Sequence, residues 1–213
     1  MEKFFKINTL DPLLLTLPED DVLSRLGRNR YLAVMDQALT VNLRLAMQRA
    51  FALCHARGRW KLLNVSEKSA DSVTLGEYWQ IKSKAFADFI QNANWIFLGA
   101  VTVSNELTMA IEQAQKSGDM LEAAIFDAVG SECADLAIGL LQKLAAAELR
   151  RYGLYISQQR FSAGYGGVEL FHQQEIFQQL ELETLGIHLT ETFIMQPEKS
   201  VTAFAFVNNG AMQ

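Results

Sequence analysis

Cysteine and proline are scarce in this chain, and long apolar runs are missing. Its 213 residues include two cysteines and three prolines. Cys54 and Cys133 form no C-x-x-C pair and do not cluster with the three histidines at ligand spacing, so we expect two small buried hydrophobes and no metal site. No uncharged apolar run reaches the roughly 18 residues of a membrane span, and no signal peptide opens the chain. The sequence therefore predicts a soluble, cytoplasmic protein.

Positive charge is not in excess either. Lysine and arginine number 19, aspartate and glutamate number 24, and the net charge is −5. Without a basic stripe to neutralise phosphates, nucleic acid is excluded as the expected partner. A chain of this length buries roughly 70% of its unfolded surface, so a core forms without disulfides or metals. No linker divides the sequence, and we expect one unit spanning residues 1–213.

Helical and strand patterns are interleaved along the chain. Apolar residues recur at helical spacing over 31–56, and the longest helical pattern covers 120–152. Because no regular β-α-β spacing appears, the pattern predicts an α+β fold with a twisted antiparallel or mixed sheet and long helices. Shorter helices are predicted at 19–27, 84–91, 105–115 and 170–185, and strands at 60–65, 71–75, 94–103, 155–161, 187–195 and 200–207.

Two glycines lie inside the longest predicted helix. Gly130 and Gly139 each cost about 1 kcal/mol relative to alanine at a helix interior position. Together with nearby alanines they predict that another element packs closely against this helix.

Residues 160–167 form the most informative segment, in which an arginine precedes a glycine-rich loop. The planar guanidinium of Arg160 suits a carboxylate, and the glycines let backbone N–H groups approach a ligand. Tyr165 stands between two glycines and is free to reach outward. These groups fit an amino-acid-like ligand, whereas the alternative interpretation is a turn whose glycines only satisfy geometry. The spacing matches neither a dinucleotide fingerprint nor a P-loop.

Four segments, in this order, resemble the activation domain of cobalamin-dependent methionine synthase. They are RFSAGYG at 160–166, QQEIF at 173–177, GIHLTET at 186–192 and MQPEKSV at 195–201. Upstream, LGAVTV at 98–103 and FDAVGSE at 126–132 are similar to stand-alone relatives of that domain. The resemblance covers about residues 20–207 and implies the α+β fold of that family.

The resemblance also implies a function. In that family the domain binds S-adenosylmethionine and meets a corrinoid carried by another module, which is reduced and then methylated. Arg160 would hold the carboxylate of S-adenosylmethionine, and Tyr165, the candidate catalytic residue, would lie at the corrinoid face. Alignment of methyl donor and acceptor would be the contribution of the protein. The implied cofactor-binding residues are Arg160, Ser162, Ala163, Gly164, Tyr165 and Gly166.

The sequence lacks the Asp-x-His-x-x-Gly signature of cobalamin-binding modules. We therefore expect action in trans on a corrinoid protein, with a flavodoxin-type or iron-sulfur protein as electron donor. The chain departs from the family at Ala163, where proline is usual. It also departs at Gly167 and Val168, where stand-alone relatives often carry Asp-Trp, and it has no tyrosine near its C-terminus.

Two other functions are compatible with the same residues. In the first alternative, the chain is a non-catalytic module that docks on a corrinoid protein and has lost the ability to bind S-adenosylmethionine. Alternatively, it would be an unrelated small-molecule binding protein whose glycine-rich loop grips a carboxylate.

Overall fold

An antiparallel sheet forms the centre of the molecule. The computed structural model describes residues 1–27 and 37–210, and within those ranges seven strands join in one sheet. Its order is β4-β3-β2-β5-β9-β6, with β1 beside β2, and every neighbouring pair is antiparallel. The predicted α+β class is confirmed. The strands are β1 (Asn8–Leu10), β2 (Arg57–Lys68), β3 (Ser72–Leu75), β4 (Trp79–Lys82), β5 (Trp95–Thr102), β6 (Leu154–Ile156) and β9 (Ser200–Asn209).

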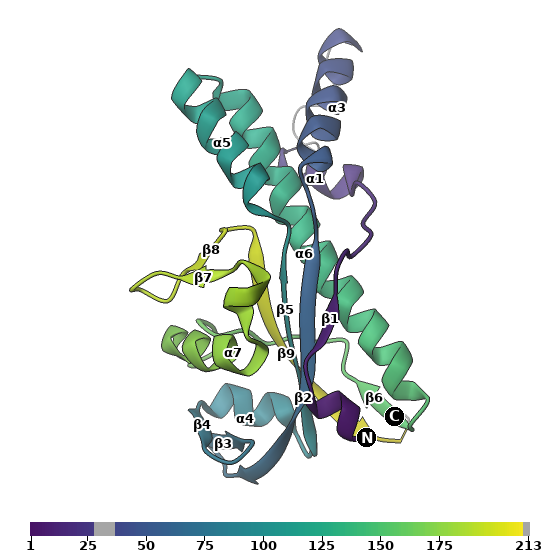
Figure 1. Cartoon of the computed structure of the whole chain (residues 1–213), viewed down its shortest axis with the longest axis vertical. Coiled ribbons are helices and arrows are strands. Elements are labelled where there is room, and N and C mark those ends of the chain that lie inside the picture. The colour runs from purple at the N-terminus through teal and green to yellow at the C-terminus, as the bar shows by residue number, and fades with distance from the viewer. Residues whose placement is uncertain (28–36, 211–213) are drawn as a thin grey trace.

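Helices cover both faces of this sheet (Figure 1). The longest, α6 (Met120–Arg150), crosses one face, and α1 (Glu19–Arg25), α3 (Gln37–Ala52) and α5 (Asn105–Ser117) pack beside it. The other face carries α4 (Lys84–Ile90) and α7 (Gln173–Leu180). Short 3-10 helices lie at Glu2–Phe5, Leu170–His172 and Leu182–Leu185, and β7 (His188–Leu189) and β8 (Met195–Gln196) form a separate hairpin.

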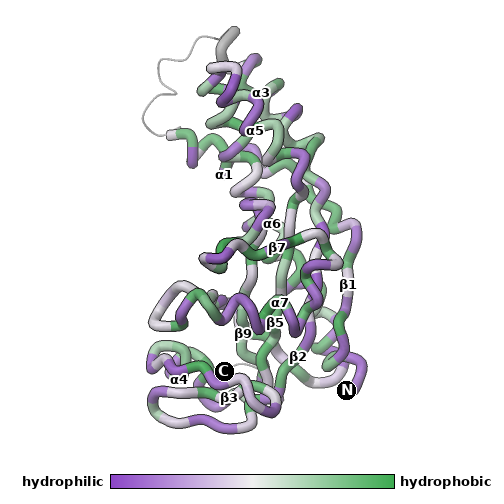
Figure 2. Tube along the Cα trace, turned by 60° about the vertical axis from the view of Figure 1, so that its left-hand side comes forward, coloured by the Kyte–Doolittle hydropathy of each residue, from purple (hydrophilic) through white to green (hydrophobic). Residues whose placement is uncertain are grey.

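Two apolar cores result, one on each face. Trp60 and Phe97 point toward α6, whereas Ile96 and Leu98 pack with the α4 and α7 side. Because β5 lies between β2 and β9 and is covered on both faces, its residues form an almost continuous apolar run. The apolar colouring of the central strands in Figure 2 shows the same arrangement. This apolar run made the strand recognisable in the sequence, and β5 confirms the strand predicted at 94–103.

Several predicted boundaries are wrong. The helix predicted over 31–56 ends at Ala52, and its residues 31–36 lie outside the described ranges. Gly58 lies within β2, where an added Cβ would stand 2.8 Å from a Val101 methyl group. The sequence did not predict β1 and β4, because three or four residues show too little alternation to be recognised.

The C-terminal third is also more broken than predicted. A single helix expected over 170–185 is divided, because Glu181 adopts a left-handed conformation after α7. The strand expected over 187–195 is two short strands joined by a turn. The strand expected over 155–161 stops at Ile156, so Arg160 lies in an irregular segment rather than at a strand end.

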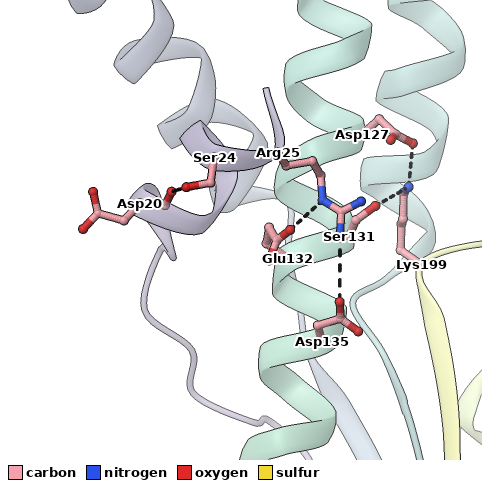
Figure 3. A network of polar contacts seen from close by, with 8 residues as sticks. All are labelled: Asp20, Ser24, Arg25, Asp127, Ser131, Glu132, Asp135 and Lys199. Atoms are coloured by element: carbon pink, nitrogen blue, oxygen red, sulfur yellow. Dashed lines mark hydrogen bonds and ion pairs between the residues drawn. The ribbon is translucent and has the colours of Figure 1, made fainter. Parts of the chain in front are cut away.

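Close packing against α6 is confirmed at Gly130. An added Cβ there would lie 2.7 Å from Leu107 Cδ2 and 3.0 Å from Lys199 Cγ. The Lys199 stem crosses the helix at this point, and its ammonium group donates to Asp127 at 2.5 Å and to Ser131 at 3.0 Å (Figure 3). The missing side chain therefore lets Lys199, which precedes β9, lie directly on α6. No helix in the described ranges is long and apolar enough to cross a membrane.

The two cysteines, distant in sequence, are neighbours in the fold. Cys133 is fully buried on α6, and Cys54, just beyond α3, is half-buried. A hydrogen bond with the Cys133 thiol, and then burial, raise the pKa of the Cys54 thiol well above its usual range. A thiol that stays protonated is a poor nucleophile, so Cys54 acts as a small apolar residue at the edge of the core, and Cys133 is buried within it, as the sequence predicts.

The two α6 glycines provide a matched test of this packing. The methyl group added by Gly130→Ala would push Leu107 and Lys199 away from α6. We therefore expect this substitution to lower the free energy of unfolding by about 1 kcal/mol or more. Gly139→Ala meets only Arg160 Nη1 at 3.7 Å, so the better helix propensity should raise that free energy by up to about 1 kcal/mol. Urea denaturation of both variants measures the difference. Equal shifts would contradict the packing described.

His172 provides a second test, because the effect of its burial on the pKa outweighs the opposing effect of the Glu169 and Glu175 carboxylates. It is 6% exposed, and its Nδ1 accepts a hydrogen bond of 3.1 Å from Trp79 Nε1. Burial lowers the pKa of His172 below its usual 6.5. The folded protein therefore disfavours the protonated form, while the unfolded chain binds the proton freely.

We expect the free energy of unfolding to fall as the pH drops below about 6.5 and through the lowered pKa of His172. His172→Gln removes the titrating group and keeps an acceptor for Trp79, so it should flatten this dependence between neutral and acidic pH. His188→Gln, at an exposed position, is the matched control and should leave the slope unchanged. Denaturant titrations at a series of pH values provide the measurement, and identical slopes for both variants would refute the assignment.

Candidate functional site

A cleft of about 850 Å³ runs along the exposed side of α6. Its walls come from three parts of the chain that are far apart in sequence: the N-terminal segment 14–16, α6, and the segment 155–160 that follows the start of β6. The lining residues are Leu14, Leu15, Thr16, Asp135, Leu136, Gly139, Leu140, Gln142, Lys143, Ala146, Arg150, Tyr155, Ile156, Ser157, Gln158 and Arg160.

One face of α6 forms the floor of this cleft. The lining residues of the helix recur every three or four positions from Asp135 to Arg150, which places them on one side. Leu136, Leu140 and Ala146 make this floor apolar. Gly139 leaves room beside the Arg160 guanidinium, since an added Cβ would stand 3.7 Å from Nη1. The second helix glycine therefore opens the cleft instead of admitting a packed element.

The opposite wall is a bulge between β6 and the glycine-rich loop. The N–H of Ser157 donates to the Phe206 carbonyl, and Phe161 exchanges both backbone hydrogen bonds with Phe204. Three residues separate Ser157 from Phe161, but one residue separates Phe206 from Phe204, so the chain leaves the sheet between these anchors. This excursion carries Arg160 to the cleft.

Gln142 joins the bulge to the helix. Its Nε2 donates to the Ser157 carbonyl at 2.6 Å, and its Oε1 accepts from Arg160 Nη1 at 3.1 Å. Gln142 is buried, whereas Arg160 is exposed toward the cleft. The guanidinium is therefore held in a defined position while remaining open to a ligand.

The cleft carries more positive than negative charge. Lys143, Arg150 and Arg160 line it, and Asp135 is the carboxylate among the lining residues. Arg25 lies beyond Asp135, with Nη2 4.0 Å from its carboxylate, but makes its closer contact of 2.5 Å with Glu132 (Figure 3). The hydrogen bond to Glu132 raises the pKa of Arg25 above its usual range. Asp135 is thus left largely available to a ligand.

The glycine-rich loop is ordered by its own hydrogen bonds. The Gly164 N–H donates to the Val168 carbonyl at 2.8 Å, and Ser83 Oγ donates to the Gly166 carbonyl at 2.6 Å. Gly166 has φ +55°, and an added Cβ would lie 2.4 Å from the Phe161 ring, so both its conformation and its surroundings require glycine. These contacts fix the direction in which the loop presents Tyr165.

The predicted site residues are divided between two places. Arg160 lines the cleft. Ser162 Oγ donates to the Thr202 carbonyl, and Ala163 is buried in the core under α4 and α7. Tyr165 is 74% exposed and is not among the residues that line the cleft. The structure therefore brings one of the six predicted residues to the cleft and displays the tyrosine on a separate part of the surface.

Sequence reasoning missed most of the cleft. The sequence alone does not single out Gln142, Lys143 or the segment 14–16, and it does not distinguish Asp135 from a residue on a solvated helix face. The sequence does contain one indication of the cleft, because Asp135, Gly139 and Lys143 are spaced four residues apart. This spacing places a carboxylate, a position without a side chain and an ammonium group on one face of the helix.

Among the comparisons with known proteins, a family model and a solved structure match this chain. The family described as "Vitamin B12 dependent methionine synthase, activation domain" matches residues 62–212. A solved structure, described as the crystal structure of the MetH reactivation domain bound to AdoHcy, superposes with a TM-score of 0.70 at 18% identity. That likeness covers 98% of this chain and 80% of the other, and at this identity it shows a shared fold. A search of curated proteins finds no match.

The Gln142 bridge generates a prediction about the cleft. Gln142→Leu leaves the Ser157 carbonyl without its donor, so we expect the free energy of unfolding to fall by about 1–3 kcal/mol. Gln174→Leu, at an exposed position of α7, is the control and should change little. Denaturant unfolding compares the two variants. If they behave alike, Gln142 does not hold the bulge.

Proposed function

Because this chain belongs to the family of activation domains of vitamin B12-dependent methionine synthases, we propose that it binds S-adenosylmethionine in the cleft along α6 and assists reductive methylation of a corrinoid carried by a partner protein. The observation that carries the proposal is Arg160, held by Gln142 with its guanidinium exposed to the cleft. A planar cation in a fixed position suits a carboxylate, because two parallel hydrogen bonds can form.

The amino-acid part of the ligand fits the charges at this end of the cleft. Its carboxylate would face Arg160, and its ammonium group would face Asp135. Gly139 lies one turn after Asp135 on α6 and beside the Arg160 guanidinium, and it provides space for the ligand backbone. The adenosyl group would lie against the apolar floor of Leu136, Leu140 and Ala146.

The partner surface would be separate from the cleft. Tyr165 and Phe171, which are 74% and 44% exposed, place aromatic rings outside the core, one on the rigid loop and one on the following 3-10 helix. Exposed aromatic side chains favour flat apolar partners such as a corrinoid ring. A reduced corrinoid supplies the nucleophile that accepts the methyl group, after a flavodoxin-type or iron-sulfur protein has supplied an electron. The residues of this chain hold the donor and position the partner.

Isothermal titration with S-adenosylmethionine tests the donor site. Arg160→Ala should weaken binding by about tenfold to a hundredfold, because a hydrogen bond between charged groups contributes about 1.5–3 kcal/mol. Arg44→Ala, which removes an exposed ion pair with Glu19, is the matched control and should leave the affinity unchanged. The proposed donor site fails if the unmodified protein shows no heat at millimolar ligand, or if the two variants titrate alike.

A second measurement separates the full activity from docking alone. Formation of methylated corrinoid on a partner protein, with a chemical reductant and S-adenosylmethionine, should be lost in Arg160→Ala. Tyr165→Ala should retain S-adenosylmethionine affinity while the yield of methylated corrinoid falls. Capture of the corrinoid protein without any S-adenosylmethionine binding would instead support the non-catalytic docking function.

A further inference from the structure

A second cavity, of about 490 Å³, shares no lining residue with the cleft along α6. Its walls come from the N-terminal segment 5–7, from Lys61 on β2, from Tyr78 in the turn before β4, and from the C-terminal end of α7. This volume lies within the range of sites that bind small organic molecules. The cavity has no part in the proposed function.

Two ammonium groups line this cavity, those of Lys6 and Lys61. Neither of them forms an ion pair with a residue that the structure describes. Lys61 is half-buried, and burial lowers its pKa, although the Glu181 and Glu175 carboxylates oppose this effect. A cation that is partly removed from water and has no paired charge is stabilised when an anion lies beside it.

Gln179 on α7 holds the ammonium group of Lys61 in place. Its Oε1 accepts a hydrogen bond of 3.0 Å from Lys61 Nζ, and its Nε2 donates to Glu175 Oε1 at 2.8 Å. Glu175 therefore orients the amide, and the amide orients the ammonium group. An ammonium group has three N–H donors, and Gln179 accepts from one of them. The others remain for a ligand or for solvent.

The groups around the two lysines favour phosphate over a carboxylate. A lysine ammonium group is a compact point charge that suits phosphate, whereas a carboxylate is matched best by the planar fork of arginine. Tyr78, which is 70% exposed, and Gln178 add a hydroxyl and an amide that can donate to further oxygens. Phe5 and Ile7 make the N-terminal wall apolar, and the cavity is larger than a phosphate ion, so an organic group has space there.

One lining group opposes the binding of an anion. The exposed Glu181 follows α7, and its carboxylate acts on Lys61 without forming an ion pair with it. The lining thus carries two cations and one carboxylate, which leaves an excess of one positive charge. Removal of this carboxylate should therefore have the opposite effect on anion affinity to removal of either lysine.

We propose that this cavity is a second ligand site, which binds the phosphoryl group of a small phosphate ester between Lys61 and Lys6, with the organic part of the ester against Phe5 and Ile7. The bound group would connect the N-terminal segment to β2 and α7. Because the cavity and the cleft share no residue, binding here is independent of S-adenosylmethionine.

Titration calorimetry with inorganic phosphate and with phenyl phosphate tests this site. We expect inorganic phosphate to bind with a dissociation constant of about 1 mM, the affinity that two hydrogen bonds between charged groups provide. Phenyl phosphate should bind about tenfold more tightly, because its ring is removed from water against the apolar wall. Sodium chloride at equal ionic strength controls for the screening of surface charges.

Variants with opposite expected effects make the test specific. Lys61→Gln should weaken phosphate binding about tenfold or more, and Lys6→Gln, at an exposed position, should weaken it about threefold to tenfold. Lys82→Gln, exposed on the edge strand β4, is the matched control and should preserve the affinity. Glu181→Gln should tighten binding about twofold to fivefold, whereas Glu183→Gln, exposed and outside the cavity, should leave it unchanged.

The outcomes separate this site from the donor site. The proposal is overturned if neither phosphate compound binds, or if Lys6→Gln and Lys82→Gln titrate alike. Equal affinities for the two compounds would overturn the ester and leave a site for the free ion. S-adenosylmethionine should bind the unmodified protein and Lys61→Gln equally. If Lys61→Gln loses both ligands, the fold has been disturbed, and Lys6→Gln decides the result. Failure of the unmodified protein to bind S-adenosylmethionine would overturn the proposed function alone.

Discussion

The candidate site depends on one buried amide side chain. Gln142 uses both ends of its amide, donating to the Ser157 carbonyl and accepting from Arg160. The helix, the bulge and the arginine are thereby held as one unit. A buried amide that satisfies both a donor and an acceptor is favourable, and leaving either partner unpaired is costly. The position of the exposed Arg160 guanidinium is thus determined by a buried side chain.

Several motif residues that resemble the family turn out to hold the fold together. Lys199 lies against Gly130 and bonds to Asp127 and Ser131, so the segment before β9 is fixed on α6. Gln173, at the start of α7, exchanges hydrogen bonds with Thr202 on β9. These contacts place α6 and α7 on opposite faces of the same strand. Residues of such a motif can therefore be needed to join the layers of the fold as well as to bind a ligand.

The sequence predicts those helices and strands that are determined by residues close together in the chain. β5 is an almost continuous apolar run, and Gly118 ends α5 in a left-handed conformation that glycine adopts easily. Gly153, also at positive φ, belongs to the turn that follows α6. The bulge at 157–160 depends on anchors in β9, some 45 residues later, and has no local pattern.

The cleft was harder to predict for the same reason. Asp135 and Lys143 look like any solvated helix face until the N-terminal segment and the bulge are placed beside them. The sequence singles out Arg160 because it precedes a glycine-rich loop, and in the structure this residue lines the cleft. Tyr165 was singled out through the resemblance to the family, and in the structure it is exposed but not among the residues that line the cleft.

The two ends of the described chain converge on the turn that joins α6 to β6. The Phe4 ring packs edge-on against Tyr152 at 5.1 Å, and the Gly210 N–H donates to the Gly153 carbonyl. The two ends of the described chain therefore lie near each other in the fold (Figure 1). A short peptide could close the chain into a ring there, and new termini could be opened at the β7–β8 turn with every layer retained. The same geometry suits insertion of the whole unit into a surface loop of a larger protein, because both ends of the unit would connect to that loop at neighbouring points.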